Sequence, residues 1–111
     1  MSGAARHWWL MRLSSALLVP LSLWFVWAAV RLAGADHAAA SGFMANPING
    51  LAAVLLAAIG LYHTVAGTRE VIEDYVPGEG AVAALVWLLR AAAVIAFLAV
   101  LYAVYRLTFG G

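Results

Sequence analysis

The sequence predicts an all-α membrane protein with three transmembrane helices. Of its 111 residues, 67% are hydrophobic and 10% are charged, and the mean hydropathy is +0.98. A soluble domain is about half apolar and a quarter charged. Three apolar runs, each near the roughly 20 residues that a membrane-spanning helix needs, cover about 13–31, 48–68 and 82–106. They are too long and too uniformly apolar to be strands, so we expect one membrane domain over residues 1–111.

The first predicted span lies between two arginines, Arg12 and Arg31. Pro20 falls inside it and is expected to kink the helix, which a membrane helix tolerates better than a soluble one. The segment 1–9 does not resemble a secretory signal, because the apolar run after it is too long and lacks a convincing cleavage site. We therefore expect the first span to remain in the mature protein.

The second and third predicted spans are joined by a short polar segment, residues 69–80, that we expect to be a loop. Asn46 and Pro47 predict a turn followed by a helix start, with the proline near the first helical position. The third span is interrupted only by Arg90. This arginine is expected to reach back to the membrane surface, and pairing with an acidic residue of the loop is the alternative.

Composition excludes several classes of function. The net charge is +1, so a nucleic-acid partner is not expected. The chain has no cysteine, which excludes disulfides, Cys-ligated iron–sulfur clusters, zinc–thiolate sites and haem attached through cysteines. Any haem bound here would therefore be held without a covalent link, as b-type haem is.

The placement of arginines predicts the orientation in the membrane. With three spans, the N-terminus and the second loop share one side, and cytoplasmic segments carry an excess of basic residues. That side has Arg6, Arg12 and Arg69, with Arg90 within reach, against Arg31 and Arg106 on the other. The N-terminus is therefore expected to face the cytoplasm.

His63 is the most informative residue, because it is the only histidine within a predicted span. An ionisable ring in hydrocarbon is costly and usually has a partner, and imidazole is a ligand of haem iron. Gly60 and Gly67 lie one turn to either side on the same helical face. They either leave room for a flat macrocycle or allow another helix to approach, and spacing alone favours a packing histidine. A haem here would need a second chain for its other ligand, and Arg12 could pair with its propionates or act simply as a surface anchor.

Asp74 and Tyr75 follow the second span by one or two turns. A phenol can donate a hydrogen bond to a carbonyl oxygen, and a nearby carboxylate can relay protons, which are the needs of a quinone being reduced. The alternative, favoured by spacing alone, is a tyrosine at the membrane interface beside a solvated acidic loop. A third interpretation makes His63, Arg90 and Asp74 a proton path in a small transporter or channel subunit.

The stretch from Leu61 to Val76, LYHTVAGTREVIEDYV, resembles the signature of the hydrophobic membrane-anchor family of succinate dehydrogenase, respiratory complex II. That signature is a histidine, a glycine four residues later, and Asp-Tyr eleven and twelve residues after the histidine. The segment 7–15, with its arginine at Arg12, is similar to the family's entry into the first helix. Chain length and the three spans agree as well, whereas the third span matches only in being apolar.

The resemblance implies a partnership with a second three-helix anchor protein in a bacterial inner membrane. The two anchors would share one b haem and dock the flavoprotein and iron–sulfur subunits on the cytoplasmic side. It further implies that His63 is an axial haem ligand, that Tyr75 bonds a ubiquinone carbonyl, that Asp74 supports Tyr75 and proton delivery, and that Arg12 approaches the haem propionates or the quinone pocket.

We therefore expect a subunit of a succinate:quinone oxidoreductase that contains no complete active site of its own. Three alternatives stay open at this point. The first is a fumarate reductase anchor, which runs the reaction in reverse. The second is a small proton-coupled transporter subunit, and the third is a structural anchor without haem.

Overall fold

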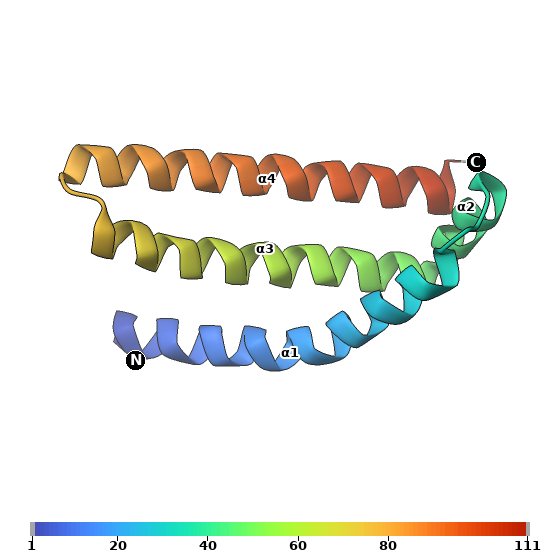
Figure 1. The fold of residues 1–111 in the computed structure, drawn as a ribbon, viewed down its shortest axis with the longest axis horizontal. Coiled ribbons are helices and arrows are strands. Elements are labelled where there is room, and N and C mark those ends of the chain that lie inside the picture. The colour runs from blue at the N-terminus through green and yellow to red at the C-terminus, as the bar shows by residue number, and fades with distance from the viewer. Residues whose placement is uncertain (1, 111) are drawn as a thin grey trace.

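The computed structural model, which describes residues 2–110, contains three long helices side by side and one short helix at an end of the bundle (Figure 1). The long helices are α1 (Gly3–Leu32), α3 (Pro47–Tyr75) and α4 (Glu79–Phe109), and the short one is α2 (His37–Ala45). By length and composition, each of the three long helices can cross a membrane. This confirms the predicted all-α class and the predicted number of spans.

α3 is the central helix and packs against both α1 and α4. The N-terminus and the turn between α3 and α4 lie at one end of the bundle, whereas α2 and the C-terminus lie at the other (Figure 1). The bundle measures 50 × 26 × 25 Å. Three antiparallel helices thus place the N-terminus and the second connection on the same side, as the sequence predicts.

The long helices extend beyond the apolar runs, because a helix need not end where the hydrocarbon ends. α1 begins at Gly3, where the Ser2 hydroxyl accepts a hydrogen bond from the Ala5 N–H at 3.1 Å. α3 continues through the charged segment to Tyr75 and stops before Pro77, whose ring disfavours a helical residue before it. The loop expected over residues 69–80 is therefore a tight turn, in which Gly78 adopts a φ of +90°.

α2 is a helix in a segment where the sequence predicts only a loop between the first two spans. Its nine residues are mostly small, and the Asp36 carboxylate accepts a hydrogen bond from the Ala39 N–H at 2.8 Å to cap the helix. The next helix begins as predicted: Asn46 caps it through the Ile48 N–H at 2.9 Å, and Pro47 occupies its first turn.

Two further features shape the bundle. α1 curves toward α2 in its second half, beyond Pro20 (Figure 1), which agrees with the expected kink. Near the same end, Asn49 joins three elements: its side chain accepts a hydrogen bond from Trp24 Nε1 at 3.3 Å and donates one to the Phe43 carbonyl at 2.9 Å.

Few side chains are buried within the chain itself. The buried residues within 2–110 are Ala28, Gly50, Ala66 and Val86, together with one polar residue, Ser14. Many large apolar side chains are exposed on all three long helices. Such an exterior suits lipid and neighbouring subunits rather than water.

Candidate functional site

The candidate site is built where one face of α1 meets one face of α3. Both faces repeat at intervals of three and four residues, which is the spacing of one helical face. The α1 face consists of Met11, Ser14 and Leu18, and the α3 face consists of Gly60, His63 and Gly67. Because the helices are antiparallel, Met11 meets Gly67 and Leu18 meets Gly60. Ser14 and His63 form the middle pair, between two pairs of apolar contacts.

The two glycines allow this close approach of α1. A Cβ atom built on Gly60 would lie 3.9 Å from Cδ2 of Leu18, and one built on Gly67 would lie 3.9 Å from Cε of Met11. Both positions are thus in ordinary contact with side chains of the same chain. Of the two interpretations of these glycines, the structure favours close helix packing over room for a macrocycle between them.

The Ser14 hydroxyl connects the imidazole of His63 to the backbone of α1. Its Oγ donates a hydrogen bond to the Met11 carbonyl oxygen at 2.9 Å and lies 2.9 Å from Nδ1 of His63. Ser14 is only 5% exposed, and it is the one buried polar residue within 2–110. His63 is half-buried. One ring nitrogen is thereby held, whereas Nε2 has no hydrogen bond to any residue that the structure describes.

A single imidazole limits the kind of metal that this site can hold. No group of three or more histidine, cysteine or acidic residues within 2–110 is placed to hold a metal ion. The chain on its own therefore offers no multi-ligand metal centre in the described part. An iron that already carries four porphyrin nitrogens needs only axial ligands, so one imidazole per chain fits that chemistry.

Arg12 lies on a different face of α1 from Ser14. Its guanidinium is 4.7 Å from the centroid of the Trp8 ring, in a cation–π contact. Together with Trp8, Met11 and Ser15, Arg12 lines a small open cavity of about 310 Å³. Arg12 is two residues from Ser14 in the chain, but it makes no hydrogen bond to the imidazole of His63.

Asp74 and Tyr75 are the last two residues of α3, and both are exposed. The Tyr75 side chain is 81% exposed. Eleven and twelve residues of continuous helix separate them from His63, which corresponds to about 17–18 Å along the axis at 1.5 Å per residue. The predicted site residues therefore form two groups, an imidazole inside the bundle and a phenol–carboxylate pair at its end.

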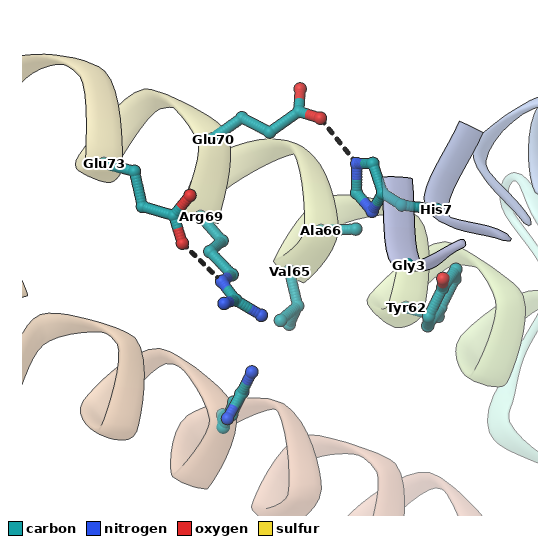
Figure 2. Close-up of a pocket in the computed structure, with 9 residues that line it drawn as sticks. Gly3, His7, Tyr62, Val65, Ala66, Arg69, Glu70 and Glu73 are labelled. Atoms are coloured by element: carbon teal, nitrogen blue, oxygen red, sulfur yellow. Dashed lines mark hydrogen bonds and ion pairs between the residues drawn. The ribbon is translucent and has the colours of Figure 1, made fainter. Parts of the chain in front are cut away.

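A polar cluster that the sequence does not predict lies at the same end of the bundle. His7 Nε2 lies 2.5 Å from a Glu70 carboxylate oxygen, and Arg69 Nε lies 2.6 Å from a Glu73 carboxylate oxygen (Figure 2). These four residues and Arg90 border a cavity of about 490 Å³. From the sequence alone, His7 has no assigned chemistry and the glutamates are most simply solvated charges. A pairing 63 residues apart leaves no local signal in the sequence.

Arg90 and His63 lie on opposite sides of α3: Arg90 belongs to α4, whereas His63 faces α1. Arg90 also borders the apolar groove between α3 and α4, which includes Leu61, Val65 and Phe97. His63 instead pairs with Ser14 of α1. A proton path through both residues and Asp74 would have to cross α3, so the geometry does not favour the transporter interpretation.

Comparison with known proteins gives a consistent family relationship. The family model described as succinate dehydrogenase/fumarate reductase transmembrane subunit matches residues 3–105. The succinate dehydrogenase hydrophobic membrane anchor subunit of Paracoccus denitrificans is 30% identical over 97 residues, which cover 82% of this chain and 75% of that protein. The protein of the same description from Rickettsia felis is 32% identical over 75 residues and covers 68% of this chain. The chain spans about 62% of the length of that Rickettsia relative. No solved structure matches.

Proposed function

Since this chain belongs to the succinate dehydrogenase/fumarate reductase transmembrane subunit family, we propose that it anchors a succinate:ubiquinone oxidoreductase and supplies one axial ligand to a b-type haem through His63. The observation that carries the proposal is the state of this imidazole. It is held through Nδ1 inside a membrane-spanning helix, and Nε2 is free of hydrogen bonds to the described residues. A histidine that served packing alone would need no unengaged nitrogen at this depth.

The second axial ligand would come from a partner anchor protein, because this chain has no other histidine within its long apolar runs. A b haem, when bound, supplies one-electron redox chemistry. The task of this chain is to hold the imidazole in orientation and to keep water away from it. The exposed apolar faces of the bundle supply surfaces on which such a partner can pack.

The quinone would be bound at the end of the bundle that carries Tyr75. The phenol would donate a hydrogen bond to a ubiquinone carbonyl oxygen, and Asp74 would orient the phenol and pass protons from water. Both side chains are exposed in the isolated chain, as a site completed by other subunits requires. Arg12, at the same end, would serve the haem propionates or the quinone pocket through its guanidinium.

The same end would dock the iron–sulfur and flavoprotein subunits and would face the bacterial cytoplasm. Arg6, Arg12 and Arg69 lie toward this end, which is the bias expected of a cytoplasmic side. Succinate would be oxidised in the soluble subunits, and this chain would contribute no residue to that step. A fumarate reductase anchor is the second candidate, since the matched family includes both enzymes.

The haem proposal is tested by His63→Ala in the assembled, membrane-extracted complex. We expect the b-haem absorption bands to disappear or to shift strongly. His37→Ala is the matched control, because His37 lies in the exposed α2 helix and bonds only Ser41 at 3.3 Å among the described residues. An unchanged haem spectrum in His63→Ala, with the protein correctly assembled, would overturn the proposed ligation.

The anchor role is tested separately by gentle purification of the tagged chain. A flavoprotein, an iron–sulfur protein and a second small anchor should co-purify with it in a fixed ratio. Recovery of the intact, folded chain without those three proteins would contradict the proposal.

A further inference from the structure

We propose that Ser14 is a positioning residue for His63: its hydroxyl oxygen accepts a hydrogen bond from Nδ1–H, fixes the imidazole tautomer and leaves the Nε2 lone pair available to a haem iron. The inference rests on the proposed haem ligation and adds a residue outside the matched histidine, glycine and Asp-Tyr signature. Its basis is the pair of contacts made by one buried hydroxyl.

Counting protons fixes the direction of the bond. A serine hydroxyl has one proton and two acceptor lone pairs. In the structure Oγ donates that proton to the Met11 carbonyl at 2.9 Å. The 2.9 Å contact with Nδ1 must then use Oγ as the acceptor, so Nδ1 carries hydrogen. A neutral imidazole protonated at Nδ1 has its lone pair on Nε2, which is the form that binds a metal through Nε2.

The surroundings make this choice of tautomer stable. The contacts Met11–Gly67 and Leu18–Gly60 lie one turn to either side of the Ser14–His63 pair. Ser14 is only 5% exposed, so water has little access to the site and cannot readily replace the hydroxyl as the hydrogen-bond partner of Nδ1. The Met11 carbonyl is held in place by the helix. The backbone of α1 therefore fixes the direction of the Ser14 O–H bond, and the hydroxyl oxygen in turn fixes the orientation of the His63 ring.

The arrangement has an electronic consequence as well as a geometric one. A hydrogen bond from the remote N–H of a ligating histidine raises the basicity of the ligand and fixes its ring orientation. A more basic imidazole stabilises ferric over ferrous iron, so Ser14 should lower the haem midpoint potential. Loss of the acceptor should raise that potential even where haem is still bound.

The neighbouring Ser15 offers a matched control. Its hydroxyl donates to the same Met11 carbonyl at the same distance, 2.9 Å, but Ser15 is exposed and makes no hydrogen bond to His63. Replacing Ser15 therefore removes an equivalent backbone hydrogen bond from α1 without touching the imidazole. A difference between the two serines isolates the bond to Nδ1 from any general effect on the helix.

The experiment is redox potentiometry of haem in the assembled complex carrying Ser14→Ala, Ser14→Cys or Ser15→Ala, with haem content and thermal midpoint measured in parallel. We expect a positive shift of the midpoint potential in Ser14→Ala, a smaller positive shift in the near-isosteric Ser14→Cys, and none in Ser15→Ala. A wild-type potential in both Ser14 variants overturns the inference, as does an equal shift in Ser15→Ala. If Ser14→Ala does not assemble, the Cys variant decides alone.

The outcome of His63→Ala separates this inference from the proposed function. If the haem spectrum of His63→Ala is unchanged, ligation itself is wrong and both proposals fail. If the haem bands of His63→Ala disappear or shift strongly while the Ser14 variants keep the wild-type potential, ligation stands and only the role of Ser14 is refuted.

Discussion

The two sides of α3 are built from different kinds of side chain. Toward α1, the helix presents an imidazole that pairs with a buried hydroxyl, and one carboxylate that pairs with His7. Toward α4, its apolar part presents mostly small and aliphatic side chains, with Gly50 tightly opposed to Val104 and Thr108, and charged residues follow only near its C-terminal end. One helix thus provides polar, titratable groups on one face and rigid packing on the other. Substitutions on the two faces should therefore differ in their effects on stability and on activity.

The largest effect is expected from Gly50→Val on the α4 side. A Cβ atom at position 50 would lie 3.0 Å from Cγ1 of Val104 and 3.3 Å from Oγ1 of Thr108, so a branched side chain forces the helices apart. Overpacking of this kind costs about 1–3 kcal/mol. The thermal midpoint of the complex should fall, and haem and quinone activity should be lost together.

Gly80→Val is the control for that variant, because a Cβ atom at position 80 would meet no atom within 4 Å. A complex with Gly50→Val that keeps its thermal midpoint would show that the α3–α4 contact is not the rigid side of α3.

Tyr75→Phe should impair quinone reduction without loss of stability. Removing the phenol hydroxyl would delete the proposed hydrogen bond to ubiquinone, worth about 1.4 kcal/mol, or roughly a tenfold fall in turnover with ubiquinone. Succinate oxidation with an artificial acceptor should be preserved. Tyr102→Phe, at an exposed tyrosine of α4, is the control. Equal loss of both activities in Tyr75→Phe would indicate misassembly and would remove the quinone role.

Asp74→Asn should have a smaller effect that depends on pH. An amide cannot relay a proton, but at an exposed position water can partly substitute, so we expect a few-fold loss of quinone turnover. The loss should deepen as pH rises, because hydronium becomes scarcer. Steady-state rates across a pH series would measure it, and a pH-independent deficit would argue against proton delivery.

The smallest effect is expected from breaking the His7–Glu70 pair. Both side chains are largely exposed, at 41% and 56%, and exposed pairs contribute about 0.2–1 kcal/mol. His7→Ala, Glu70→Ala and the double variant form a cycle in which thermal midpoints give the coupling. A coupling well above that range would mean that this pair, rather than Ser14–His63, holds α1 to α3.

The fold is largely predictable because run length and composition decide it. Three apolar runs of sufficient length predict three spans, and Asn46 with Pro47 marks the start of α3. The ends of α1 and α3 are not predictable from hydropathy, since the charged residues up to Tyr75 favour helix as well as water. α2 is not predictable either, because its nine residues are too few for a span and resemble a connecting loop in composition.

The site can be predicted from the sequence only where a single residue is unusual in its position, without knowledge of its tertiary contacts. His63 stands out because an imidazole in an apolar run is costly. Ser14 does not, because a serine at the start of a predicted span carries no particular signal and its role depends on the register between α1 and α3. The same holds for His7 and Glu70. The assignments of Arg12, Asp74 and Tyr75 stay predictions, since they concern molecules and subunits beyond this chain.

The uninterrupted course of α3 from Pro47 to Tyr75 has a mechanical consequence. The continuous helix fixes both the distance along its axis and the angle around its axis between the imidazole of His63 and the phenol of Tyr75. One inserted residue between positions 64 and 74 would turn Tyr75 by about 100° around the axis and move it by only about 1.5 Å. The span would still cross the bilayer, but the two groups would address different neighbours.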